Sequence, residues 1–86
     1  MPYIKEGDRK FAYDDPASLG ELNYCITSRI LKYLDNINQA GMRASYTDYN
    51  NIIGVLECAK LEFYRRMVAE YEDQKLRENG DVFPTV

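Results

Sequence analysis

Apolar residues recur at three- and four-residue spacing in two stretches of the chain, as they do on one face of an α-helix. The first stretch carries one stripe, formed by Leu22, Ile26, Ile30 and Tyr33, with Cys25 beside it. Ser18 and Glu21 precede this stripe as a capping box, in which each side chain satisfies a free backbone N–H at the helix start. The pattern weakens beyond position 36, and Gly41 ends it. It predicts a helix over residues 18–36 and a connection over residues 37–46.

The second stretch is longer and carries two adjacent stripes. One consists of Ile52, Leu56, Ala59, Phe63 and Met67, and the other of Ile53, Tyr64, Val68 and Tyr71. Ser45 or Thr47 can cap its start, and Gly80 suits its end because glycine readily adopts the left-handed conformation found after helices. The pattern predicts a long helix over residues 47–79 and a tail over residues 80–86.

A polar segment with several aromatic residues, the lead segment (residues 1–17), precedes both stretches and is expected to hold a short helical turn around residues 9–13. At 1.5 Å per residue the first helix spans roughly 28 Å and the second roughly 50 Å, so a hairpin leaves residues 64–79 beyond the first helix. An apolar stripe on a lone helix needs cover, from the lead segment or from another copy. We therefore expect an all-α fold: an antiparallel helical hairpin with a long second helix and the lead segment packing on it. This single domain, residues 1–86, is expected to assemble as a homo-oligomer.

Composition excludes several classes of function. Eleven Lys and Arg against fourteen Asp and Glu give a net charge of −3, which argues against a DNA or RNA polymer as partner. The chain has no histidine, the commonest general base and metal ligand, and no phosphate-binding glycine motif. Cys25 and Cys58 are expected to be reduced and buried. We expect no enzymatic activity, cofactor, metal or membrane partner, and a cytoplasmic location.

Aromatic and basic residues are the candidate binding groups. Eight tyrosines supply rigid rings with a polar tip, suited to stacking on a base or a partner chain, or simply to amphipathic helix boundaries. Tyr3 lies where a core role is least natural. Basic residues gather near Lys5 and Arg9 and again at Arg65 and Arg66, enough for one or two phosphates. The alternative is surface ion pairing with Glu62, Glu70 or Asp14.

Two glycines within the predicted helices each allow two interpretations. Gly54 costs roughly 1 kcal/mol against alanine inside a helix, which favours close approach of another backbone over tolerated destabilisation. Gly20 can leave helix-start N–H groups open to an anion, or can serve as an ordinary residue of the capping turn.

Several segments resemble a family of small uncharacterised proteins found in bacteriophage and prophage genomes. The matching residues are 1–5 and 8–10 at the start, 20–27 and 53–66 in the two helices, and 71–75 and 78–82 at the end. The resemblance implies a virus-encoded accessory protein acting in the host cytoplasm. Small oligomeric helical phage proteins include sponges that trap host nucleotide immune signals.

Together these features favour a non-enzymatic anti-defence sponge that binds a cyclic or linear nucleotide in pockets between protomers. The expected contacts are Tyr3, Lys5 and Arg9 from the lead segment, Asn23 and Tyr24 from the first helix, and Arg65 or Arg66 from the long helix. The alternative is a helical adaptor or inhibitor that binds a host or virion protein.

Overall fold

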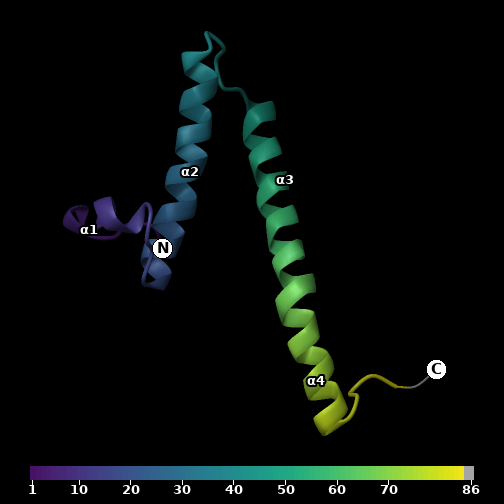
Figure 1. Ribbon diagram of the computed structural model, residues 1–86. Coiled ribbons are helices and arrows are strands. Elements are labelled where there is room, and N and C mark those ends of the chain that lie inside the picture. Colours follow the sequence, from purple (N-terminus) through teal and green to yellow (C-terminus); the bar gives the residue numbers. More distant parts are fainter. Residues whose placement is uncertain (85–86) are drawn as a thin grey trace. The chain divides into compact units, whose positions relative to one another are not determined.

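The computed structural model describes residues 1–84, and every regular element within them is helical (Figure 1). The elements are α1 (Glu6–Ala12), α2 (Leu19–Gln39), α3 (Tyr46–Phe63), a π-helical segment η1 (Tyr64–Val68) and α4 (Ala69–Asn79). The all-α prediction is therefore confirmed. The chain divides into two units, Met1–Tyr49 and Asn50–Val86, which are described separately below.

The start of α2 is capped as predicted. The backbone N–H of Glu21 donates to Oγ of Ser18 at 3.1 Å, and the Glu21 carboxylate accepts hydrogen bonds from the Ser18 hydroxyl at 3.1 Å and from the backbone N–H of Ala17 at 3.4 Å. In a standard capping box the carboxylate binds the backbone N–H of the cap residue itself. Here it reaches the preceding residue, so Ser18 and Glu21 together satisfy two backbone donors.

The end of α2 lies three residues beyond the predicted boundary, at Gln39 instead of residue 36. The side chain of Asn38 does not interrupt the helix, because its Oδ1 accepts a hydrogen bond from the backbone N–H of Ala44 at 3.2 Å. The helix stops where Gly41 adopts a φ of +80°, a conformation that side-chain-bearing residues rarely adopt. Gly41 therefore ends the helix as expected.

The helical turn predicted around residues 9–13 is instead a two-turn helix, α1, that begins earlier. Glu6 and Asp8 lie in its first turn, where negative charge interacts favourably with the helix dipole. α1 packs on α2, and Ala12 at this contact is the one fully buried residue among residues 1–84. The lead segment is thus held on α2, within its own unit.

Tyr13, which follows α1, connects it to α2 through both its ring and its backbone. The guanidinium of Arg29 lies 4.6 Å from the centre of the Tyr13 ring, within cation–π range. Sγ of Cys25 donates to the Tyr13 carbonyl at 3.1 Å. Both cysteines are free, as expected, but Cys25 is only half-buried and Cys58 is exposed, so the expectation of two buried thiols is wrong.

The long helix begins at Tyr46, one residue before the predicted start. Oδ2 of Asp48 accepts hydrogen bonds from the backbone N–H of Ser45 at 2.8 Å and from its hydroxyl at 3.1 Å, which fixes the cap. The helix then runs without a break to Asn79, and Gly80 follows with a φ of +89°. Gly80 therefore ends the long helix as the sequence predicts.

The π-helical segment was not predicted, and it changes which residues share a face. At Ala69 the backbone N–H bonds to the carbonyl of Tyr64, five residues earlier, so one extra residue is accommodated in this turn. In a regular α-helix Tyr71 is rotated by about 80° from Phe63, but the extra residue reduces this to about 20°. Tyr71 therefore belongs to the stripe of Phe63, and not to that of Ile53 as expected.

The same shift aligns Tyr64 with Glu72, also eight residues apart. The Tyr64 hydroxyl donates a hydrogen bond to Oε1 of Glu72. This contact raises the pKa of the Tyr64 phenol above its ordinary value of 10.0, first through the hydrogen bond to Glu72 and then through the negative charge of that carboxylate.

Replacing the cap residue, Ser18→Ala, is expected to lower the free energy of unfolding by about 1 kcal/mol, because the N–H of Glu21 loses its acceptor. Chemical denaturation followed by circular dichroism measures the change. Ser28→Ala is the matched control: it lies inside α2, where alanine has the higher helix propensity, and no loss is expected. Equal losses in the two variants would contradict the capping role.

Tyr64 is expected to ionise at a higher pH than an ordinary tyrosine phenol. Because its folded pKa is raised, the stabilisation from its contact with Glu72 is complete below pH 10 and is lost as the pH rises through the folded pKa. The difference in phenolate absorbance between the wild type and Tyr64→Phe isolates this titration. Glu72→Gln should return the midpoint toward 10.0, and an unchanged midpoint would rule out the contact in solution.

Candidate ligand-binding site

The structure divides the seven predicted ligand contacts between the two units. Those in the first unit are Tyr3, Lys5, Arg9, Asn23 and Tyr24, and those in the second are Arg65 and Arg66, both in η1.

Arg9 is the centre of the first group. Its Nε donates to the carbonyl of Ile4 at 3.2 Å, and its guanidinium carbon lies 5.9 Å from the centre of the Tyr24 ring. Arg9 and Tyr24 are both half-buried. One arginine from α1 thus contacts the backbone of the N-terminal segment and an aromatic ring of α2, and its position is constrained from two directions.

The N-terminal segment lies close to the first turn of α2. A Cβ atom at Gly20 would stand 3.2 Å from Cγ2 of Ile4 and 3.5 Å from the carbonyl oxygen of Met1. Gly20 is therefore a site of close approach, and the idea that it leaves helix-start N–H groups open to an anion is not supported. Close approach was expected at Gly54, but a Cβ atom there would have no neighbour within 4 Å among the described residues.

The other three predicted contacts of this unit are exposed. Tyr3 is 79% exposed, and Lys5 occupies the cap position of α1, one turn before Arg9 and on the same side of the helix. Asn23 accepts hydrogen bonds from the Thr27 hydroxyl through its backbone carbonyl at 2.8 Å and through Oδ1 at 3.3 Å. The structure therefore brings Arg9 and Tyr24 together, and leaves Tyr3, Lys5 and Asn23 on neighbouring surface.

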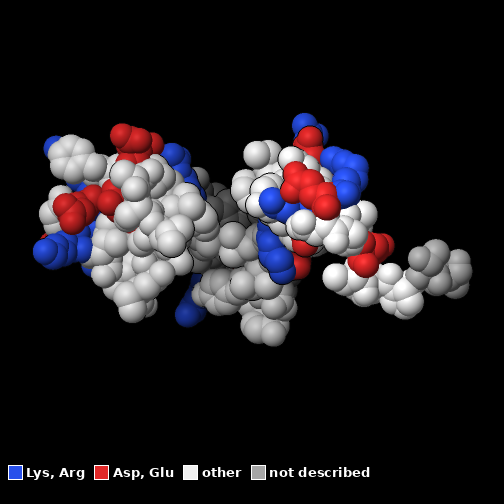
Figure 2. Space-filling view, turned by 90° about the horizontal axis from the view of Figure 1, so that it is seen from below, with Lys and Arg blue, Asp and Glu red and all other residues white. Residues whose placement is uncertain are grey.

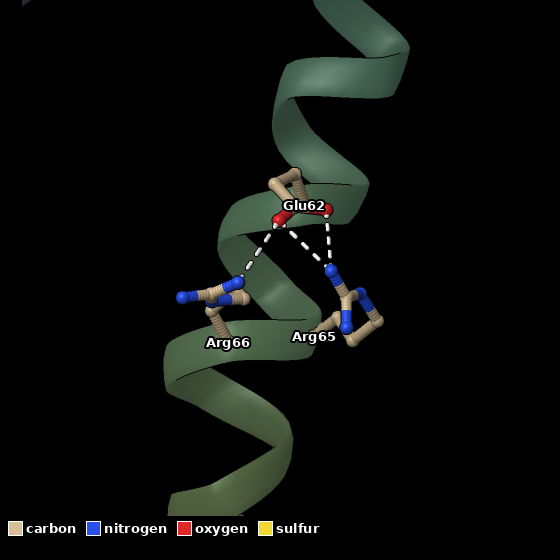
Figure 3. A network of polar contacts seen from close by, with 3 residues as sticks. All are labelled: Glu62, Arg65 and Arg66. Atoms are coloured by element: carbon tan, nitrogen blue, oxygen red, sulfur yellow. Dashed lines mark hydrogen bonds and ion pairs between the residues drawn. The ribbon is translucent and has the colours of Figure 1, made fainter.

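Arg65 and Arg66 share one carboxylate (Figure 3). Nη2 of Arg65 lies 2.9 and 2.8 Å from the two oxygens of Glu62, and Nη1 of Arg66 lies 3.8 Å from one of them. The alternative of surface ion pairing is thus confirmed for both arginines through Glu62. Two guanidinium groups against one carboxylate still leave a positive charge at this point of the helix. Such exposed pairs contribute little stability.

Sequence reasoning missed the contact between Tyr64 and Glu72, in the same part of the helix. A spacing of eight residues does not place two side chains together in a regular α-helix, and only the π-helical turn does so. The sequence carries no signal by which we could have found it.

Charges of both signs are interspersed on the face seen in Figure 2. Within residues 1–84 no three His, Cys, Asp or Glu side chains are grouped so as to hold a metal ion. No helix in that range is both long and apolar enough to span a bilayer. An open depression of about 340 Å³ lies at the end of α4, lined by Leu76, Val82 and Phe83 among others, and it contains none of the predicted contacts.

No curated protein and no solved structure matches the chain. A family model described as a domain of unknown function (DUF6899) matches residues 1–82, nearly the whole length of the chain. The chain therefore belongs to the DUF6899 family.

Proposed function

We propose that this protein is a non-enzymatic accessory protein that binds and sequesters a small nucleotide-derived signal of the host. The observation that carries the proposal is the placement of Arg9 over the Tyr24 ring. Only Nε of this guanidinium makes a hydrogen bond among the described residues, to the Ile4 carbonyl. Both terminal nitrogens thus remain for a phosphate, which arginine binds through two parallel hydrogen bonds.

Neighbouring residues extend the chemistry expected of a nucleotide site. Lys5 adds a second positive charge one helical turn from Arg9. Tyr3 offers an exposed ring for stacking on a base, and Asn23 offers an exposed amide for hydrogen bonds with base or sugar. Sequestration needs tight binding and no bond cleavage, which agrees with a chain that has no histidine.

We further propose that the helices form an antiparallel hairpin and that copies assemble, with binding pockets between protomers. α2 has 21 residues, whereas the helix from Tyr46 to Asn79 is more than half as long again. Since α1 is held on α2, another copy is the natural cover for the remaining apolar side chains. Arg65 or Arg66 of one copy then supplies charge to the lead segment of the next.

The alternative is an adaptor or inhibitor that binds a host or virion protein. It is favoured by the large apolar side chains of the long helix, among which Val55 is 67% exposed and Phe63 is 63% exposed. Capture of one specific protein from infected-cell lysate, together with no nucleotide binding, would favour this second function. In either case the resemblance to phage proteins makes the host cytoplasm the proposed place of action.

The binding proposal predicts that a nucleotide will raise the melting temperature of the protein. The probes are cyclic dinucleotides and ADP-ribose derivatives in a thermal-shift panel, with the affinity of any stabilising compound measured by calorimetry. Arg9→Gln should weaken that affinity by about 10- to 100-fold, since it removes a charged hydrogen-bond donor pair. Recovery of the ligand unchanged after heat denaturation would agree with sequestration.

Lys10→Gln is the matched control, because Lys10 is exposed, adjacent in α1 and equally charged. It should change the affinity by less than about threefold, as expected for an exposed charge outside the contact. If Arg9→Gln and Lys10→Gln weaken binding equally, the Arg9 site is wrong. If no compound in the panel stabilises the wild type, the adaptor becomes the better proposal.

A further inference from the structure

One face of the long helix carries an unbroken line of uncharged side chains, here called the seam. It consists of Ile52, Leu56, Ala59, Phe63, Met67 and Tyr71. From Ile52 to Phe63 the spacing of four, three and four residues keeps side chains on one face of an α-helix. Beyond Phe63 the spacing is four and four, which in a regular α-helix drifts by about 40° at each step.

The π-helical segment cancels this drift. The wider turn between Tyr64 and Ala69 accommodates one extra residue, so Met67 and Tyr71 return to the face of Phe63. The hydrogen bond from Tyr64 to Glu72 supports the same register, because those residues are also eight apart and are brought together by the same turn. The seam therefore runs straight for 19 steps of the helix, about 28 Å.

The seam is exposed where it crosses and follows η1. Phe63, Met67 and Tyr71 are 63%, 61% and 60% exposed. Side chains of this kind tend to be covered in stable proteins, and no residue of the second unit is fully buried among those described. π-helical turns are rare in proteins and are found frequently at functional sites.

We propose that the exposed part of the seam, Phe63, Met67 and Tyr71, binds the same part of the seam of a second copy of this chain. The inference rests on the assembly part of the proposed function, and it identifies the surface that carries the assembly. The inference adds that η1 serves to keep this surface straight. Pairing of two copies through the seam requires no nucleotide.

The area is sufficient for a specific dimer. With the exposed fractions above, Phe63, Met67 and Tyr71 offer roughly 450 Å² per chain, or roughly 900 Å² for the pair. With flanking side chains added, the contact reaches the lower limit for a specific protein–protein interface. A self-complementary contact of this kind is also the commonest form of assembly in soluble proteins.

The charges beside the seam permit two copies to approach. Between Ile52 and Asn79 the helix carries six acidic and five basic residues, so two copies meet without strong repulsion. Glu62 and Arg66 lie on one side of the seam, and each has a partner of opposite sign available on its own helix. No charged residue lies on the seam itself between Ile52 and Tyr71.

The test is sedimentation of the full-length protein over a range of concentrations, without ligand. The wild type should self-associate, and Met67→Glu should weaken association by at least about tenfold because it buries a charge in the contact. Leu61→Glu is the matched control: Leu61 is 55% exposed, close to Met67 in exposure, but lies on the opposite side of the helix. It should leave association within about threefold of the wild type.

A wild type that remains a 10 kDa monomer up to about 100 µM would overturn the proposal, as would equal effects of the two substitutions. Circular dichroism checks that the variants are helical. If Met67→Glu unfolds, Met67→Ala and Leu61→Ala form a milder pair in which only the first should weaken association.

The role of η1 has its own test. Deletion of Arg65 removes the extra residue, restores a regular α-helix and keeps Tyr71 on the face of Phe63, so association should persist. An alanine inserted after Arg65 rotates the rest of the helix by about 100° and should weaken association by at least about tenfold. If the deletion and the insertion act alike, η1 does not set the register of the interface. Nucleotide binding by a protein that stays monomeric would refute both the pairing through the seam and the pockets between protomers, and would leave binding at Arg9 and Tyr24 standing.

Discussion

The extra residue in the π-helical turn determines which side chains of the long helix share a face. With it, Met67 and Tyr71 follow Phe63, and the Tyr64 hydroxyl reaches Glu72. Without it, the apolar residues beyond Phe63 spiral away from those before it. One turn of π-helix, in which the backbone N–H of Ala69 bonds to the carbonyl of Tyr64 five residues earlier, therefore separates a helix with one straight apolar face from a helix whose apolar residues are spread over several.

This register matters because the helices bury so little by themselves. Ala12 is the one fully buried residue described, and the lead segment meets α2 through directional contacts of Arg9 with Tyr24 and of Tyr13 with α2, besides the close approach at Gly20. Such contacts fix geometry, but they supply much less free energy than a buried apolar core. We therefore infer that stability and function are linked in this protein. In the proposed assembly, the surface that must be covered for the helices to persist is also the surface on which copies or partners would meet.

The helix ends were predictable because they depend on local chemistry. Ser18 with Glu21, Gly41 and Gly80 all act where the sequence placed them. The end of α2 was misplaced because Asn38 bonds forward to the connection, a contact that spacing does not reveal. The pair of Arg65 with Glu62 follows from helical neighbours and was foreseen as an alternative, whereas the meeting of Arg9 with Tyr24 depends on how α1 packs on α2. Long-range contacts of this kind are not encoded in periodicity, and neither is the π-helical turn.

The two proposed uses of the long helix are compatible because they require different faces. Arg65 lies about half a turn from Phe63, on the side of the helix away from the seam. Pairing through the seam would therefore leave Arg65 in water, where it keeps its ion pair with Glu62. A phosphate carries more negative charge than the Glu62 carboxylate and could still compete for the Arg65 guanidinium. Arg66 lies beside the seam, where a second copy would partly cover its side chain. Because this would exclude water, the attraction between the Arg66 guanidinium and a negative group would become stronger. Assembly in this form would sharpen a nucleotide site rather than compete with it, and an adaptor bound to the seam would do the opposite by displacing the second copy.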